Sequence, residues 1–269
     1  MIDLIAVDID GTLLNANKVL TQETIEALHD ANNRGLKIVL CTGRPYLAAK
    51  PVLDLLGLKG IDDYLVTFNG GQIHRASDGR VIHKETLSYE DFNLWFKEFQ
   101  RLKLPFNAID DQWVYEPETD NSPYPSIYVS QVTSAPAKKI DYHSFNPSNS
   151  FLKFVVATDE RYLDKQLQKM DENLLKGYEL VKSHPFQIEI CQCGVSKGQA
   201  LAFLGDRLNI PMEHMMAIGD QENDRSMIQA VGLGVAMGNA SPSLKEVADY
   251  VTKDNNDHGV AHAIYNFIK

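Results

Sequence analysis

The sequence predicts an α/β protein: a doubly wound parallel sheet of the Rossmann-like type, with a second α+β domain inserted into it. Residues 1–84 alternate between buried-strand and helix patterns, residues 85–190 lose this alternation, and residues 191–269 resume it. Alternating strands and helices are typical of a parallel sheet covered by helices on both faces. We therefore expect a discontinuous core of residues 1–84 and 191–269, and an inserted α/β cap domain of residues 85–190.

The first part of the chain reads as strand, helix, strand, helix, strand. Its apolar runs at residues 4–7, 36–41 and 64–68 are continuous, as in strands buried on both faces of a parallel sheet. An apolar stripe at helical spacing follows Thr21, a favoured N-cap residue, and another follows Pro45, a residue favoured at helix starts. These signals predict a β-α-β-α-β unit.

The middle of the chain has a different pattern. The turn signals NGG (69–71) and SDG (77–79) predict short hairpin strands, and an aromatic stripe at residues 92–99 predicts a helix packed on a core. Residues 117–150 show no clear periodicity, whereas residues 159–175 read as one long polar helix. We interpret residues 85–190 of this stretch as the inserted domain.

Composition limits the class of partner. With 36 acidic and 26 basic residues the formal net charge is −10, which argues against nucleic acid or an anionic membrane as the main partner. The N-terminus lacks a secretory pattern, and no apolar run approaches the roughly 20 residues of a membrane span. We expect a cytoplasmic monomer or homodimer. The three cysteines, Cys41, Cys191 and Cys193, are too few for a disulfide framework and are expected to be buried strand thiols.

The segment IDLIAVDIDGTLLN, residues 2–15, ends an apolar run in two aspartates, Asp8 and Asp10. In an extended segment residues i and i+2 project to the same side, so these carboxylates would share one small volume. At about 6 Å and an effective dielectric of about 20 they would repel by roughly 3 kcal/mol. Such a site requires a cation between the oxygens, a shared proton, or exposure to water.

Other reactive side chains also follow predicted strands or begin predicted helices. Ligands of open α/β sheets collect at the carboxyl ends of the strands. The residues found there are Asp8, Asp10, Thr42, Asp220, Asn223 and Asp224, with Lys197 at a helix start. Carboxylates suit Mg²⁺, while a hydroxyl, free amides and an ammonium group suit phosphoryl oxygens. Each motif alone is common in turns and caps, but four separate segments supply parts of one phosphate-and-metal site.

The segments DIDGTLL, TGRP, VSKG and GDQEND resemble the four motifs of the haloacid dehalogenase-like phosphatases. The resemblance covers the whole chain, because the insertion between TGRP and VSKG is similar to the large cap of the Cof-type subfamily. Within it, TFNGG and GVAMGNA are similar to segments of sugar-phosphate phosphatases. The chain departs from the pattern at Cys193, where proline is common, and in residues 117–150. The resemblance implies a Mg²⁺-dependent phosphatase of small phosphorylated metabolites, in particular sugar phosphates.

The resemblance also implies a role for each motif residue. Asp8 is the expected nucleophile, which forms an aspartyl-phosphate. Asp10 is the expected general acid for the leaving alcohol and then the base for water. The expected ligands of Mg²⁺ are Asp8, the backbone carbonyl of Asp10, and Asp220. Asp224 is expected to contact these ligands without binding the metal itself. Because acid catalysis needs a proton at neutral pH, we expect nearby negative charges to raise the pKa of Asp10.

The remaining site residues are expected to bind phosphate or substrate. The expected phosphate-binding residues are Ile9, Thr42, Gly43, Lys197 and Asn223. Arg44 and Asn69 follow strand ends and are candidate substrate contacts. Gln187 and Glu189 alternate onto one face of an inserted-domain strand and are weaker candidates.

Three alternatives use similar residues. A phosphomutase on the same fold would differ by requiring an activating bisphosphate. A phospho-accepting receiver domain also uses acidic strand ends, a threonine and a lysine, but it is much shorter and lacks the second aspartate. A non-catalytic sugar-phosphate sensor is disfavoured because every reactive position is filled.

Overall fold

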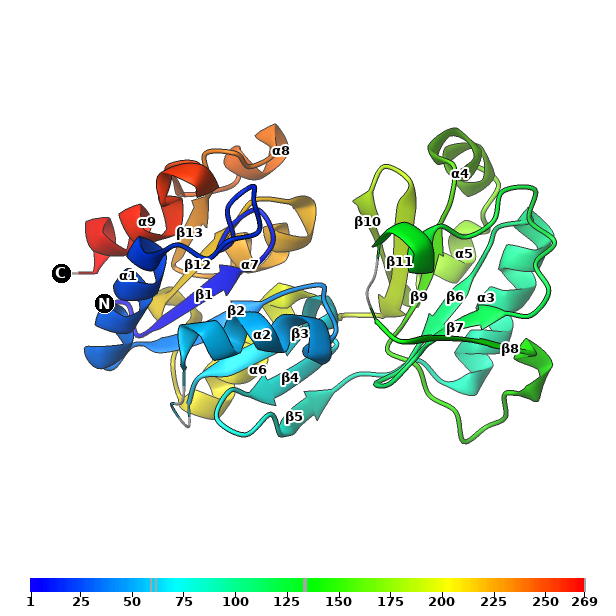
Figure 1. Cartoon of the computed structure of the whole chain (residues 1–269), viewed down its shortest axis with the longest axis horizontal. Helices are drawn as coiled ribbons and strands as arrows, with labels where there is room; N and C mark the ends of the chain where they lie inside the picture. The colour runs from blue at the N-terminus through cyan, green and yellow to red at the C-terminus, as the bar shows by residue number, and fades with distance from the viewer. Residues whose placement is uncertain (59, 61, 133–134, 269) are drawn as a thin grey trace. The chain divides into compact units, whose positions relative to one another are not determined.

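The computed structural model describes residues 1–58, 60, 62–132 and 135–268. The chain divides into two units (Figure 1): unit 1 comprises Met1–Lys84 and Ser196–Lys269, and unit 2 comprises Glu85–Val195. The second boundary therefore falls at 195/196 rather than at the predicted 190/191. The reason is that strand β11 (Gln187–Gln192) runs past residue 190 before the chain turns at Gly194.

Unit 1 is built on an eight-stranded sheet of order β14-β13-β12-β1-β2-β3-β4-β5. Neighbouring strands from β14 to β3 are parallel, and β4 and β5 add an antiparallel hairpin after β3. The strands are β1 (Leu4–Asp8), β2 (Lys37–Cys41), β3 (Tyr64–Thr67), β4 (Gln72–Arg75), β5 (Val81–Lys84), β12 (Met215–Gly219), β13 (Leu233–Ala236) and β14 (Tyr250–Val251). The predicted Rossmann-like α/β class is confirmed.

The helices of unit 1 begin where the sequence signals predicted. Helix α1 follows Thr21, α2 follows Pro45, and α6 follows Ser196, whose hydroxyl accepts a hydrogen bond from the amide of Gln199. Figure 1 shows α1 and α9, blue and red, packed side by side. The helices are α1 (Gln22–Asn33), α2 (Tyr46–Leu56), α6 (Lys197–Leu208), α7 (Arg225–Ala230), α8 (Pro242–Lys245) and α9 (Gly259–Phe267), with short 3₁₀ turns η1 (Phe68–Gly70), η4 (Met212–His214), η5 (Glu222–Asp224) and η6 (Asn255–Asp257).

Strand register brings the reactive residues of unit 1 to one edge. Every residue of β1 is buried, as its continuous apolar run predicted. In the parallel ladders Asp8 lies opposite Cys41 of β2, while Val7 lies opposite Ile218 of β12. Because the three strands run parallel, the residues that follow them emerge together at the carboxyl edge of the sheet.

Unit 2 is a separate α+β body with a six-stranded sheet of order β10-β11-β9-β6-β7-β8. One face packs on an aromatic core that includes Phe92, Trp95 and Phe99, so the stripe at 92–99 is core as predicted. Its elements are α3 (Tyr89–Leu102), β6 (Asn107–Ile109), β7 (Val114–Pro117), the π-helix η2 (Tyr128–Val132), β8 (Ala137–Ile140), η3 (Tyr142–Ser144), β9 (Lys153–Ala157), α4 (Glu160–Leu167), α5 (Glu172–Leu175), β10 (Tyr178–His184) and β11.

Two local predictions were wrong. The expected helix at 159–175 is two helices, α4 and α5, because the side chain of Asp171 accepts the amide of Asn173 and caps a new helix. Cys193 is exposed rather than buried, since β11 ends one residue before it, whereas Cys41 and Cys191 are buried. Within the described chain, the helices are all too short or too polar to span a bilayer.

Candidate active site

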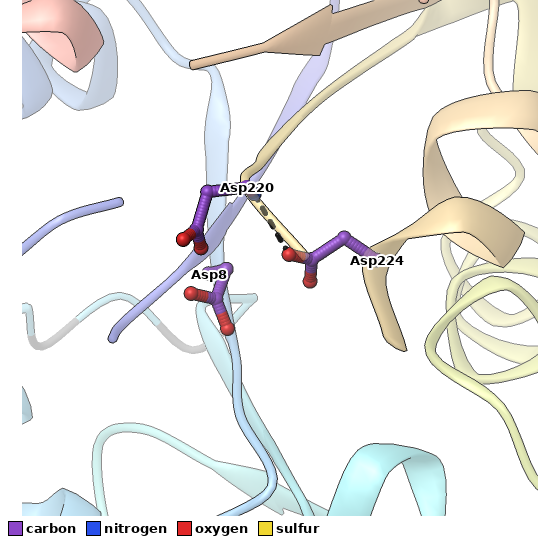
Figure 2. Close-up of side chains that lie close together, drawn as sticks. All are labelled: Asp8, Asp220 and Asp224. Carbon is purple, nitrogen blue, oxygen red and sulfur yellow. Dashed lines mark hydrogen bonds between the residues drawn. The ribbon is translucent and has the colours of Figure 1, made fainter. Parts of the chain in front are cut away.

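A buried lysine lies at the centre of the site. The Nζ of Lys197, in the first turn of α6, lies 2.5 Å from Oδ1 of Asp8 and 2.6 Å from Oδ1 of Asp224. Lys197 and Asp224 are both fully buried, and Asp8 and Asp220 are 4 % exposed. In Figure 2 the carboxylates of Asp220, directly after β12, and Asp224, in η5, point toward Asp8 at the end of β1.

Short polar contacts fix the acidic groups. The Oδ2 of Asp224 accepts the backbone amides of Asp220 and Gln221, at 2.9 and 3.0 Å; the first bond is the dashed line in Figure 2. The hydroxyl of Thr12 donates to Oδ1 of Asp220 at 3.1 Å. Gly11 has φ +84°, and a Cβ there would lie 2.3 Å from Asp220 Oδ2, so only glycine allows the loop after β1 to pass this close.

The site carries an excess of negative charge. Burial, the carboxylate of Asp224 and the carboxylate of Asp220 together raise the pKa of Asp8 well above its usual range, although Lys197 opposes them. Burial and Asp224 raise the pKa of Asp220 to about 6. Burial would lower the pKa of Lys197, but Asp224 and Asp8 outweigh it and hold the ammonium charged. Three carboxylates against one ammonium leave two negative charges when all are ionised.

This arrangement can hold a divalent cation. Ligand oxygens of Asp8, Asp220 and Asp224 lie within 4.8 Å of one another. Asp224 already uses one oxygen on Lys197 and the other on two amides, so Asp8 and Asp220 are the better ligands. A cation between them would neutralise their negative charge. Without a cation, buried carboxylates lose that charge by taking up protons.

The side chain of Asp10 is not part of the group formed by Asp8, Asp220 and Asp224. Strand β1 ends at Asp8 and the chain turns at once, with Leu13 N donating to Asp8 O. Both Asp10 oxygens instead bind Arg44, whose Nε and Nη2 each lie 2.6 Å away. Lys18 adds a third contact at 2.9 Å.

These contacts also reverse the expected charge state of Asp10. Burial raises the pKa of the carboxyl, but hydrogen bonds from Arg44 and Lys18 outweigh burial and hold the pKa below its usual value. A carboxylate with both oxygens on Arg44 has no proton to give to a leaving group. General acid catalysis by Asp10 therefore requires its separation from Arg44.

A second chain of contacts joins the loop after β2 to the loop after β12. Thr42, buried, accepts the amide of Arg44 on its hydroxyl at 3.1 Å, and its carbonyl accepts the amide of Asn69 at 2.9 Å. The amide nitrogen of Asn223 donates to Oδ1 of Asn69 at 3.1 Å. Gly43 lies against the Asn69 side chain. Asn69 is 5 % exposed, so its side chain faces protein rather than solvent.

Unit 2 holds the other two candidates in a buried polar cluster. Glu189 accepts from Lys153 at 2.7 Å and from Gln187 at 2.8 Å, and Ser183 donates to it at 3.1 Å. Gln187 and Glu189 are 2 % and 5 % exposed, so both are committed to partners inside unit 2. Ile9, predicted to bind phosphate, buries its side chain in the core of unit 1.

Sequence reasoning assigned no role to several residues that shape the site. Thr12 lies inside the quoted DIDGTLL segment, and Asn239, which donates to Gly11 O at 2.8 Å, lies in GVAMGNA. Both residues lie in segments that carry the family resemblance, and this position could have identified them from the sequence. Lys18, which contacts Asp10, had no distinguishing feature in the sequence.

Comparison with known proteins identifies the family. A family model described as haloacid dehalogenase-like hydrolase matches residues 5–264. The chain belongs to the haloacid dehalogenase-like hydrolases. YxeH of Bacillus subtilis (strain 168) is 37% identical over 271 residues, which cover 100% of this chain and 99% of YxeH. The 5-amino-6-(5-phospho-D-ribitylamino)uracil phosphatase YcsE of the same organism is 32% identical, covering 99% of this chain and 96% of YcsE.

Solved structures agree with this family membership. The crystal structure of a haloacid dehalogenase-like hydrolase from Bacteroides thetaiotaomicron matches with a TM-score of 0.84 and 26% identity, covering 100% of both chains. The predicted family and fold class are therefore confirmed. The predicted enzyme class, a phosphoric monoester hydrolase, agrees with membership of a hydrolase family that contains named phosphatases.

Proposed function

We propose that this hydrolase is a Mg²⁺-dependent phosphatase that cleaves phosphate monoesters of small metabolites, sugar phosphates in particular, through an aspartyl-phosphate at Asp8. The observation that carries the proposal is the position of Asp8. Its carboxylate lies at the end of a buried strand, 2.5 Å from a buried ammonium and beside two further carboxylates. A nucleophilic carboxylate beside an ammonium and a candidate cation site suits attack on a phosphoryl group.

The first step forms a bond between a carboxylate oxygen of Asp8 and phosphorus and breaks the ester bond to the leaving alcohol. Lys197 neutralises negative charge on the transferring group, and the Thr42 hydroxyl with the amides of its loop offers donors to phosphoryl oxygens. Mg²⁺ held by Asp8, the carbonyl of Asp10 and Asp220 would supply Lewis acidity and charge neutralisation. Asp224 orients Lys197 and the Asp220 backbone.

The second step is hydrolysis of the aspartyl-phosphate. In the first step Asp10, once it has left Arg44 and taken up a proton from solvent, donates that proton to the leaving alkoxide. In the second step the resulting carboxylate takes a proton from the attacking water. Water adds to phosphorus, the bond to Asp8 breaks, and inorganic phosphate is released. The name of the relative YcsE supports an ester on a polyhydroxylated chain as substrate, because the substrate it names is a phosphoribityl compound.

Trapping the phosphoenzyme tests the proposal. Wild type with Mg²⁺ should release phosphate from a panel of sugar phosphates and from nitrophenyl phosphate, and EDTA should abolish this until Mg²⁺ is restored. Asp8→Asn should form no acid-stable phosphoenzyme. Asp10→Asn should give a burst of nitrophenol with accumulated phosphoenzyme, and should lose about 10²- to 10⁴-fold with sugar esters, which need the acid. Full turnover without metal, or turnover by Asp8→Asn, would sink the proposal.

A further inference from the structure

The turn after β3 has an unusual backbone. Phe68, Asn69 and Gly70 follow one another with φ of +52°, +56° and +112°. Glycine adopts such angles readily and asparagine tolerates them, but a bulky residue such as phenylalanine does so rarely and at a cost. Strained backbone of this kind persists where the surrounding structure fixes it, often beside a functional site.

The surrounding contacts show what fixes this turn. The amide of Asn69 donates to Thr42 O at 2.9 Å, and the amide of Phe68 donates to Arg44 O at 3.2 Å. The loop after β2 is thus held on both sides of its central residue. A Cβ on Gly70 would lie 2.3 Å from Ser196 O, so the turn also packs directly on the residue before Lys197.

The side chain of Asn69 reaches a third segment. Its Oδ1 accepts the hydrogen bond from Nδ2 of Asn223. An amide presents its oxygen and its nitrogen on opposite sides, so an acceptor at Asn69 fixes which way the Asn223 amide faces. With its nitrogen toward Asn69, Asn223 keeps its oxygen and its second N–H for other partners.

We propose that Asn69 positions phosphate-binding residues and does not itself contact the substrate. Its strained turn holds the Thr42 loop through backbone hydrogen bonds and holds Asn223 through the Asn69 side chain. The proposal deepens the proposed function and rests on it for the identity of the bound group. Asn69 is buried, and its side-chain oxygen accepts the hydrogen bond from Asn223. It acts through Asn223, whose rotamer and amide orientation it determines.

The first test replaces the side chain and keeps the backbone. Asn69→Gly tolerates a positive φ but removes the acceptor. The affinity for inorganic phosphate, measured by calorimetry in the presence of Mg²⁺, should fall about tenfold, the effect of one lost hydrogen bond. Asn209→Gly is the matched control, because Asn209 has φ +57° at the exposed end of α6. This control should leave phosphate affinity and kcat/KM at wild-type values.

A double-mutant cycle decides whether Asn69 acts through Asn223. After Asn223→Ala, adding Asn69→Gly should cost less than twofold more in phosphate affinity, since the contact is already absent. Fully additive losses, or an Asn69→Gly variant with wild-type affinity, would overturn the proposal. Asn69→Asp keeps an acceptor oxygen and should lose less phosphate affinity than Asn69→Gly. If Asn69→Gly does not fold, Asn69→Asp replaces it in the test. A loss of phosphate affinity in Asn69→Asp equal to that in Asn223→Ala then contradicts the proposal.

The binding measurement separates this inference from the proposed function. If wild type binds phosphate but hydrolyses no ester, the proposed function fails while the cycle still tests the role of Asn69. If wild type binds no phosphate with Mg²⁺ present, both are overturned.

Discussion

Among the described residues, each unit contains one buried lysine in contact with a carboxylate, and the two lysines differ in how their charge is balanced. In unit 2, Lys153 lies 2.7 Å from Glu189, and both side chains are at most 6 % exposed. In unit 1, Lys197 is fully buried and contacts Asp8 and Asp224, with Asp220 close by. Burial and distance are nearly the same at the two places. The difference is the number of carboxylates.

The charge balance separates a structural pair from a reactive site. Glu189 faces one ammonium and two neutral donors, Gln187 and Ser183, so its oxygens are satisfied without any added ion. At Lys197 an ionised site keeps two uncompensated charges, and the pKa of Asp8 and of Asp220 rises as a result of burial and neighbouring carboxylates. A buried excess of charge that the protein does not neutralise indicates that a ligand does so.

The largest expected effect is on catalysis at the unbalanced site. Lys197→Met removes the ammonium that would face the transferring phosphoryl group, so kcat should fall by about 10²- to 10³-fold, as when one strong donor to a transition-state anion is removed. The measurement is steady-state phosphate release with saturating Mg²⁺. Lys153→Met is the matched substitution in unit 2 and should lower kcat far less. Equal losses of kcat in the two variants would show that the charge balance around Lys197 does not matter for catalysis.

The next effect is on stability at the balanced site. Lys153→Met leaves the Glu189 carboxylate buried without its cation, which should cost about 3–5 kcal/mol of unfolding free energy. Lys153→Met combined with Glu189→Leu should recover most of this loss, because an apolar pair avoids the buried charge. Denaturant unfolding measures both variants. A double variant as unstable as the single one would mean that packing, not charge, fixes this position.

The third effect is the pH dependence of the metal-free protein. The pKa of Asp220 is about 6 in the folded state against 3.8 in the unfolded chain, so the folded state binds more protons between these values. Stability contributed by protonated Asp220 should thus be lost as pH rises from about 4 to 7, by up to about 3 kcal/mol. Asp220→Asn should lack this loss, and Mg²⁺ should reverse it in wild type at pH 7. Parallel stability curves for the two proteins would contradict the assignment.

The smallest effect is expected at an exposed pair. Lys50 and Asp54 are in contact on the surface of α2, one helical turn apart. Because water screens such pairs, Lys50→Ala should leave the melting temperature within experimental error. A clear shift in a calorimetric scan would mean that contact alone, rather than burial and charge balance, determines the importance of these lysines.

The sequence was sufficient to place Asp8, Lys197, Asp220 and Asp224 at one site, because all four belong to strand ends or helix starts that the parallel topology brings together. It was not sufficient for pairs that depend on register and rotamer. The Arg44–Asp10 contact needs the chain to turn directly after Asp8, and the apolar pattern does not report that turn. As a result the predicted rise in the pKa of Asp10 was wrong for this arrangement.

The same limit applies to other contacts. The Asn69–Asn223 bond joins residues 154 positions apart, and its partners carry no sequence signal that links them. The break at Asp171 was missed because capping by one side chain outweighs the helical periodicity of residues 159–175. Long apolar patterns were reliable, while individual polar contacts were not.

The pairing of β1 with β12 has a consequence for synthesis of the chain. Leu4 pairs with Met215, so the central strand of unit 1 lacks one neighbour until roughly 200 further residues have been made. At about 5–20 residues per second the ribosome needs roughly 10–40 s for this. Unit 2 ends at Val195, so its residues are all made before β12 begins at Met215. The apolar strand that carries Asp8 is therefore made long before its partner β12, and its sheet is completed only when the second segment of unit 1 has been synthesised.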